Sequence, residues 1–260
     1  MILTLSVNPA IDRTITTDRI NYEDRIYIRS SLEQAGGKGI NAARVLQGLG
    51  APVAALATAG GAAGQQFAEL LKSSGLPVSL IPISGPIRRN LTISDKQGLT
   101  IKLDEPGPRI SAEEERKIEA AVRRKLPGAD WLMLCGSLSP GMSADFYARL
   151  IGAAREKGVR TLLDTGGEAL RLGLDARPAL VKPNKPEAER LLGRPLLTRQ
   201  QSLEALGEIA AMGPEGVVLS LGSEGAMGVC GDGRYLAAAP EIQMACPIGA
   251  GDALAATCVW

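Results

Sequence analysis

The sequence predicts an α/β fold with a mainly parallel central sheet, helices on both of its faces and a small second β-sheet. Two observations predict this class. Short apolar runs alternate with helical patterns along most of the chain, and two strand-like segments interrupt the alternation. The 260 residues, 45% of them hydrophobic, are enough for one continuous core.

Six apolar segments are expected to be strands of the central sheet: residues 2–7, 53–58, 131–135, 161–164, 180–182 and 217–220. Their alternation with helices indicates βαβ units, whose strands run parallel. Ser111 with Glu114 and Thr198 with Gln201 have the spacing of capping boxes. These pairs predict helices near 112–125 and 199–212.

Two segments interrupt this rhythm, residues 13–33 and 86–104, and the second is typical of a hairpin with its turn at 96–98. We interpret the two segments together as a small β lid. Residues 1–12, 34–85 and 105–260 then form the large α/β domain. A lid that closes over this domain would exclude water from a site between them.

Composition excludes several classes of function. Lysine and arginine number 29 against 28 acidic residues, so no broad basic surface for nucleic acid or membrane is expected. The chain has no histidine, which removes Ser-His-Asp triads and histidine-ligated zinc. Its four cysteines lack CxxC spacing and are interpreted as reduced core thiols. With no signal peptide at the N-terminus, a cytoplasmic location is expected.

The clearest local motif is Gly249-Ala250-Gly251-Asp252, followed by small residues with helical character. Small residues let backbone N–H groups converge at a helix N-terminus, where they can bind an anion. Asp252, in the first turn, could deprotonate a hydroxyl nucleophile. An Asp that only complements the helix dipole explains the motif equally well.

A second motif spans residues 35–41, Ala-Gly-Gly-Lys-Gly-Ile-Asn, and leads into a helix. Its glycines, Gly37 among them, permit close backbone approach, so Lys38 and Asn41 could reach a polar ligand. The segment fits neither the Walker A pattern nor the dinucleotide fingerprint, which argues against a nicotinamide dehydrogenase. A flexible hinge would explain the glycines alone.

Two charged residues are candidates for ligand contacts near the lid. Asp12 follows the first strand, where a carboxylate could accept hydrogen bonds from hydroxyl groups, although Asp beside proline is also common in turns. On the lid strand, alternation should direct only one arginine of the pair Arg88 and Arg89 inward, where it could bind a phosphate. Solvated charge on an edge strand is the alternative.

Three further segments follow predicted strands. Lys182-Pro183-Asn184 precedes a helix, and Asn184 and Glu187 could order water around Mg²⁺, although a helix-capping box is the better local explanation. The loops at 136–141, with Ser137, and at 220–225, with Ser220, Gly222 and Gly225, are rich in small residues. Both could bind ligand groups or be turns.

Taken in order, these segments resemble the PfkB (ribokinase-like) carbohydrate kinase family, in its branch of 1-phosphofructokinases and tagatose-6-phosphate kinases. The resemblance covers essentially the whole chain. It rests on the segments NPAID, GGKGINAARVL, RRN, GSLSPG, LVKPNKPEAE, SLGSEGA and GAGD, in that order.

The resemblance implies a ribokinase-like fold and an ATP- and Mg²⁺-dependent kinase of a sugar phosphate. Asp252 looks like the catalytic base, and Gly249, Ala250 and Gly251 look like its anion hole. The remaining roles are implied in the same way: a sugar-phosphate set of Asp12, Gly37, Lys38, Asn41, Arg88 and Ser137, and a nucleotide set of Lys182, Asn184, Glu187, Ser220, Gly222 and Gly225, with Glu187 tied to Mg²⁺ through water. The family also implies a possible homodimer through the β lid.

Fructose 1-phosphate is the preferred acceptor, with tagatose 6-phosphate and fructose 6-phosphate as alternatives. A non-catalytic sugar-phosphate binder is the rival from another class. Two features depart from the family pattern. Cys246-Pro247-Ile248 precedes the GAGD motif where the family usually has a threonine, and the chain ends at Trp260, so the C-terminal part of the family domain is expected to be incomplete.

Overall fold

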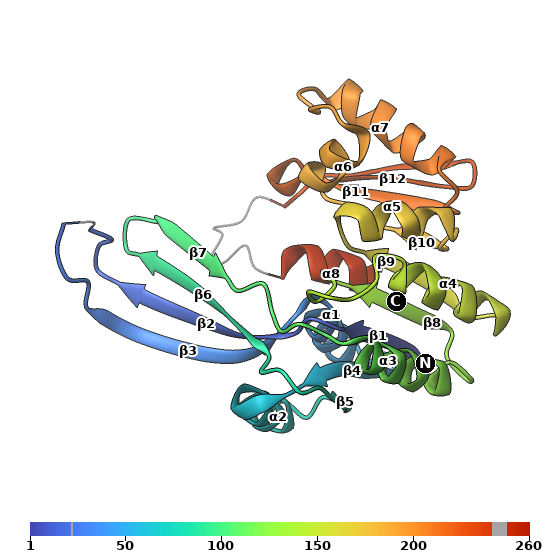
Figure 1. Ribbon diagram of the computed structural model, residues 1–260. Coiled ribbons are helices and arrows are strands. Elements are labelled where there is room, and N and C mark those ends of the chain that lie inside the picture. The colour runs from blue at the N-terminus through green and yellow to red at the C-terminus, as the bar shows by residue number, and fades with distance from the viewer. Residues whose placement is uncertain (22, 241–248) are drawn as a thin grey trace.

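The computed structural model describes residues 1–21, 23–240 and 249–260, which form an α/β structure with two separate sheets (Figure 1). Within these residues the large sheet has nine strands in the order β13-β12-β11-β10-β9-β8-β1-β4-β5. Its strands are β1 (Ile2–Ser6), β4 (Val53–Ala59), β5 (Val78–Pro82), β8 (Trp131–Cys135), β9 (Arg160–Asp164), β10 (Leu180–Val181), β11 (Gly216–Ser220), β12 (Ala226–Cys230) and β13 (Gly233–Ala237).

Neighbouring strands pair in parallel from β5 to β11, and β12 and β13 add an antiparallel edge. All six predicted strands are present, so the apolar runs identify the buried centre of the sheet correctly. Sequence reasoning missed β5, β12 and β13. β5 and β13 are the two edge strands, where fewer apolar residues are needed and Pro82 is tolerated, and β12 lies next to the β13 edge.

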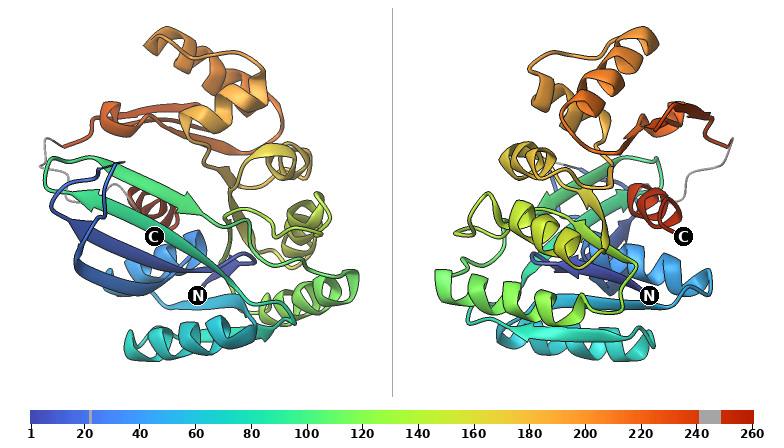
Figure 2. Two further views of the ribbon diagram at one scale, coloured as in Figure 1. Left: turned by 60° about the vertical axis from the view of Figure 1, so that its left-hand side comes forward. Right: turned by 90° about the vertical axis from the view of Figure 1, so that its right-hand side faces the viewer.

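Helices cover both faces of the large sheet. On one face α1 packs against α8, and on the other α3 and α5 both pack against α4, as the right-hand view of Figure 2 shows. Both predicted capping boxes are present, at the starts of α3 and α7. The helices are α1 (Lys38–Gly48), α2 (Gly61–Ser73), α3 (Ala112–Lys125), α4 (Phe146–Glu156), α5 (Gly167–Asp175), α6 (Lys185–Leu192), α7 (Arg199–Ala211) and α8 (Ala250–Thr257), with a 3₁₀ turn η1 at Gly222–Glu224.

The smaller sheet projects from the large one (Figure 1) and has the order β3-β2-β6-β7. Its strands are β2 (Ala10–Thr17), β3 (Ile28–Gly36), β6 (Arg88–Asp95) and β7 (Thr100–Asp104). β2 pairs in parallel with β6, and each of these forms an antiparallel pair with the strand that follows it. Because β2 already begins at Ala10, directly after Pro9, Asp12 lies in the smaller sheet.

The chain crosses twice between the two sheets at one place. β1 continues into β2 through residues 7–9, and β3 continues into α1 through Gly37. The first turn of α1 is therefore fixed beside the carboxyl end of β1. At this crossing a Cβ atom on Gly36 would lie 1.9 Å from Asp12 Oδ2, so a larger residue there would displace the Asp12 carboxylate.

The cysteines are less uniform than predicted. Cys135 is buried and Cys258 is half-buried, but Cys230 is exposed at the end of β12, so its interpretation as a core thiol is wrong. Cys246 lies outside the described residues. None of the helices in the described part of the chain is long and apolar enough to span a membrane.

Candidate active site

A cleft of about 600 Å³ opens where β1, α1, β6 and the loops after β8 and β9 meet. This is the carboxyl edge of the parallel strands, where α/β sheets bind ligands. Predicted site residues on its wall are Lys38, Arg88, Ser137 and Glu187. Other residues of the wall include Ser6, Asn8, Asp104, Gly136, Thr165, Gly166, Glu168 and Arg190.

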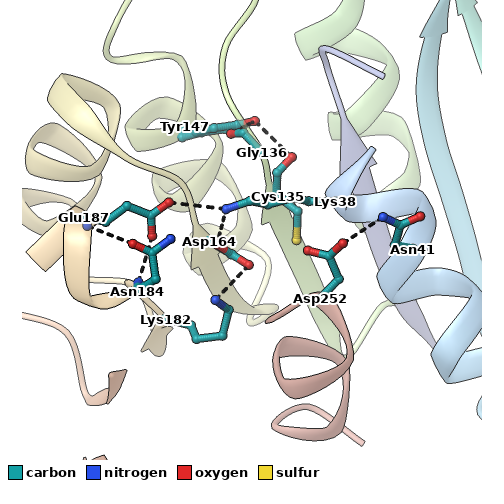
Figure 3. Close-up of polar contacts among 10 residues, drawn as sticks. All are labelled: Lys38, Asn41, Cys135, Gly136, Tyr147, Asp164, Lys182, Asn184, Glu187 and Asp252. Carbon is teal, nitrogen blue, oxygen red and sulfur yellow. Dashed lines mark hydrogen bonds and ion pairs between the residues drawn. The ribbon is translucent and has the colours of Figure 1, made fainter. Parts of the chain in front are cut away.

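Lys38 lies between two carboxylates from distant parts of the chain (Figure 3). Its Nζ atom is 2.8 Å from Asp164 Oδ1 and 3.4 Å from Glu187 Oε1. Burial alone would lower the pKa of Lys38, but the charges of Asp164 and Glu187 outweigh burial and raise that pKa above its usual value. Lys182 supplies a second cation, with its Nζ 3.2 Å from Asp164 Oδ2. Lys182, Asp164, Lys38 and Glu187 therefore form a network of alternating charges, of which Lys38 and Glu187 line the cleft.

Glu187 has two roles in this geometry. Its Oε2 accepts a hydrogen bond from the Asn184 backbone N–H at 2.8 Å, and Asn184 Oδ1 accepts one from the Glu187 N–H, also at 2.8 Å. The capping box expected as the local explanation is thus present at the start of α6. It also fixes the carboxylate so that Oε1 points to Lys38 and the cleft (Figure 3).

Asp252 lies in the first turn of α8 and is 7% exposed. Asn41 Nδ2 donates a 2.8 Å hydrogen bond to Asp252 Oδ2 (Figure 3). Burial raises the pKa of Asp252, and the nearby Asp164 acts in the same direction, while the Asn41 hydrogen bond and the charges of Lys38 and Lys182 lower it. The amide of Asn41 is thus bound to the carboxylate that the sequence identified as a base.

The GAGD turn lies over the same charge network. A Cβ atom on Gly251 would lie 3.8 Å from Lys182 Nζ, which places this turn beside the Lys182 and Asp164 pair. Gly249 is the N-cap of α8, and its φ of 87° is in the left-handed region. The three predicted glycine and alanine residues before Asp252 therefore form a helix N-terminus close to this charge network.

On the smaller sheet, Asp12 accepts a 2.9 Å hydrogen bond from Asn90 Nδ2 on the neighbouring strand. Burial is the largest influence on the pKa of Asp12 and raises it. Arg88 lines the cleft and donates to the backbone carbonyls of Asn8 and Glu105. Arg89 lies on the opposite face of the strand, so only one arginine of the pair points inward, as the alternation predicts.

The loop after β8 is tied to the loop after β1. Asn8 Nδ2 donates to Ser137 Oγ at 3.2 Å and to the Pro106 carbonyl at 3.0 Å. Its Oδ1 atom is buried and has no hydrogen-bond partner among the described residues. Ser137 is therefore held on the cleft wall.

The loop predicted to contact a nucleotide lies apart from this cleft wall. Ser220 pairs with Asn184 through an isolated β-bridge, but Ser220, Gly222 and Gly225 are not among the cleft-lining residues. A packing requirement explains Gly225, because a Cβ atom there would lie 2.0 Å from the Ala237 carbonyl oxygen. The lead-in Cys246-Pro247-Ile248 lies outside the described residues.

Sequence reasoning missed Asp164, Asn8 and Asn90 as site residues. Asp164 ends a buried strand and precedes Thr165-Gly166-Gly167, a carboxylate followed by glycines at a strand end. Asp12 was identified because it follows a strand of the sheet, where ligands bind, and the same argument could have identified Asp164. The pairing of Asn90 with Asp12 depends on the β2 and β6 register, which no local pattern contains.

Comparisons with known proteins agree with this geometry. Residues 5–259 match the family described as pfkB family carbohydrate kinase. The chain is 37% identical to a 1-phosphofructokinase of Rhodobacter capsulatus, over 98% of this chain and 81% of the relative. It is 31% identical to a tagatose-6-phosphate kinase of Staphylococcus epidermidis, over 98% of this chain and 83% of the relative.

Among solved structures, phosphofructokinase-2 from Escherichia coli in complex with fructose-6-phosphate has a TM-score of 0.90 at 32% identity, covering 98% of this chain and 84% of that one. The two-sheet fold is therefore the ribokinase-like α/β fold. Sequence match, fold and cleft geometry agree, and the chain belongs to the pfkB family of carbohydrate kinases.

Proposed function

We propose that this chain transfers the γ-phosphoryl group of ATP to fructose 1-phosphate, giving fructose 1,6-bisphosphate and ADP. One observation carries the proposal. Lys38 and Arg88 line the cleft, and Asn41, one turn of α1 beyond Lys38, binds the buried carboxylate of Asp252. This arrangement suits an anionic sugar whose hydroxyl must lose a proton.

In the proposed reaction, the acceptor hydroxyl of the sugar attacks the γ-phosphorus in line with the bond to the leaving oxygen. The new O–P bond forms, the β,γ-bridging O–P bond breaks, and the hydroxyl proton passes to Asp252. The backbone N–H groups of Gly249, Ala250 and Gly251 stabilise the charge on the transferred group. Burial supports the role of Asp252, because it raises the pKa of this carboxyl group and makes it a better proton acceptor.

Arg88 and Lys38 would bind the phosphate already on the sugar, and Ser137 would donate to it. Asp12 and Asn41 would contact the sugar, with Gly37 giving it room beside α1. On the nucleotide side we assign Lys182, Asn184, Ser220, Gly222 and Gly225. The Asn184 and Ser220 bridge supports this set, because it joins two of its members.

The carboxylates present fit Mg²⁺. Asp164 Oδ2 and Thr165 Oγ1 are buried without hydrogen-bond partners among the described residues, although Lys182 Nζ lies 3.2 Å from the former. The described residues contain no cluster of three or more potential metal ligands. Mg²⁺ in kinases needs fewer, because it binds one or two carboxylates, water and substrate phosphates. Glu187 and Asp164 would hold the ion, which supplies positive charge to the phosphate oxygens.

A coupled ADP-release assay tests the proposal. The substrates are fructose 1-phosphate, tagatose 6-phosphate, fructose 6-phosphate and unphosphorylated fructose, each with Mg-ATP. We expect turnover with fructose 1-phosphate and little with fructose, which gives Arg88 and Lys38 no anion to bind. Relatives named for tagatose 6-phosphate and 6-phosphofructokinase activity make the other two sugars the closest alternatives. Silence with all four would contradict the proposal.

The matched variants Asp252→Asn and Asp175→Asn distinguish a kinase from a binder. Asp175 is exposed on α5, so its substitution should leave the rate unchanged. Asp252→Asn should lower kcat by about 10²- to 10⁴-fold, the usual contribution of a general base. Calorimetry should still detect binding of the sugar phosphate to this variant. A non-catalytic binder would show equal binding and no turnover in all three proteins.

We also propose that two copies associate through the smaller sheet. Tyr27, Ile28, Leu32 and Leu103 are exposed apolar residues on or beside its edge strands β3 and β7. A tetrameric inhibited form is known for phosphofructokinase-2 from Escherichia coli. Sedimentation that shows only monomer would reject this association.

We place the protein in the cytoplasm, since Cys135, Cys230 and Cys258 are free thiols.

A further inference from the structure

Lys38 has two possible anionic partners within one cleft. Its Nζ atom bridges Asp164 Oδ1 and Glu187 Oε1, the pair of carboxylates that we assign to the divalent cation. The same side chain lines the cleft together with Arg88 and Ser137, the groups that we assign to the sugar phosphate. A single ammonium group cannot neutralise both sites at once.

The two lysines of this network differ in freedom. The Lys182 side chain is 3% exposed and Asp164 is 1% exposed, so this pair is fixed in the interior. The Lys38 side chain is 34% exposed and faces the cleft. Lysine has a flexible four-carbon stem, and Lys38 can therefore turn without disturbing the backbone. Even a Cβ atom added at Gly136 would lie 3.8 Å from Lys38 Cβ, an ordinary contact distance, so the base of that stem is uncrowded on this side.

Charge balance determines when Lys38 can leave the carboxylates. Lys38 and Lys182 together match the two negative charges of Asp164 and Glu187. If Lys38 moves away, Lys182 still pairs with Asp164, so only Glu187 loses its counter-ion. The carboxylate pair then has a net negative charge and oxygen ligands that suit a hard divalent cation.

We propose that Lys38 is a movable counter-ion, which occupies the Asp164 and Glu187 carboxylates in the ligand-free protein and turns to the phosphate of the sugar when it binds. This inference rests on the proposed function. Because Lys38 vacates the metal ligands as it meets the phosphate, sugar phosphate and divalent cation bind with positive coupling. By linkage, each ligand strengthens the other by the same factor. Couplings of this kind are typically about 5- to 150-fold, and we expect about tenfold here.

Metal binding without nucleotide or turnover tests this coupling. Mn²⁺ replaces Mg²⁺, because free Mn²⁺ can be measured by electron paramagnetic resonance. The wild-type protein is titrated with Mn²⁺ alone, with fructose and with each sugar phosphate of the activity assay. Protein-free titrations correct for Mn²⁺ bound by the sugar phosphate itself. We expect the Kd for Mn²⁺ to fall about tenfold with the sugar phosphate that is turned over, and to stay constant with fructose.

The matched variants are Lys38→Met and Lys72→Met. Lys72 is an exposed lysine on α2 that pairs with Glu69. Lys38→Met should bind Mn²⁺ more tightly than wild type in the absence of sugar, and sugar phosphate should no longer change its affinity. Lys72→Met should behave as wild type. Should Lys38→Met fail to fold, the wild-type titrations alone decide the question.

Two results would overturn the inference in distinguishable ways. If wild-type protein turns over a sugar phosphate and binds it, but its Kd for Mn²⁺ does not change, Lys38 does not couple the two sites and the proposed function stands. If sugar phosphate still changes the Kd for Mn²⁺ in Lys38→Met, Lys38 is likewise not the group that couples the two sites, and the proposed function stands. If the protein neither binds nor turns over any of the sugar phosphates, the proposed function is wrong and the inference falls with it.

Discussion

The hydrogen bond from Asn41 to Asp252 gives a direct test of how the site controls its base. Asn41→Ala removes the donor that lies 2.8 Å from Asp252 Oδ2 and leaves the carboxylate buried. Burial already raises the pKa of Asp252, and the Asn41 hydrogen bond opposes this by stabilising the charged form. Without the amide, the pKa of Asp252 should rise further, and a larger share of the enzyme should be protonated and inactive at low pH.

The magnitude follows from the type of bond. A hydrogen bond to a charged group contributes about 1.5–3 kcal/mol, which corresponds to about 10- to 150-fold in rate. On the acid limb of the kcat profile, Asn41→Ala should therefore be slower than wild type by about that factor. On the high-pH plateau, where Asp252 is ionised in both proteins, the two rates should converge. The midpoint of the acid limb should move to higher pH.

The assay is ADP release at saturating substrates across the pH range, with Asn90→Ala as the matched control. Asn90 makes a similar bond to a different carboxylate, Asp12. Its loss should weaken sugar binding but leave the midpoint of the acid limb in place. A loss of rate in Asn41→Ala that is equal at every pH, with an unmoved midpoint, would show that Asn41 only positions groups. That result would refute the electrostatic reasoning.

Three further predictions concern binding and stability. Arg88→Ala should lower kcat/KM for the sugar phosphate by about 10- to 150-fold, because it removes a charged hydrogen bond worth about 1.5–3 kcal/mol. Arg89→Ala should change kcat/KM little, and similar losses in both variants would contradict the assigned strand faces. Lys182→Met should lower the free energy of unfolding, measured in urea, by about 3 kcal/mol. This is the lower end of the range for a broken buried ion pair, because Lys38 still pairs with Asp164. An unchanged urea midpoint of unfolding would refute this prediction. Ser111→Ala should cost about 1 kcal/mol by loss of the α3 cap and leave turnover unchanged, which unfolding and ADP-release measurements together can check.

Much of the fold could be predicted because its signals are local. Apolar runs predicted the central strands, and the capping boxes at Ser111 and Thr198 predicted the starts of α3 and α7 to the residue. The hairpin of β6 and β7 was predicted from its turn. In each case the residues that carry the signal are neighbours in the chain, so tertiary contacts only had to agree with them.

The contacts between the site residues could not be predicted in the same way. Asn41 and Asp252 are 211 residues apart, and Lys38 and Asp164 are 126 apart. Each residue type suggested a role by itself, but the partner of each depends on which strands are adjacent in the sheet. Sequence reasoning therefore assigned Asn41 to the sugar and Lys38 to a phosphate. It did not identify the carboxylates of Asp252, Asp164 and Glu187 that these two side chains contact.

The parallel pairing of β2 with β6 has a consequence for how the protein folds. Each of the two hairpins of the smaller sheet closes a short loop, but the seam between them joins residues 10–17 to residues 88–95 across α1, β4, α2 and β5. Closing that long loop costs entropy that the hairpins do not have to overcome. We expect the seam to form late. Asp12 and Asn90 face each other across it, so the ability to bind sugar should be among the last properties regained on refolding.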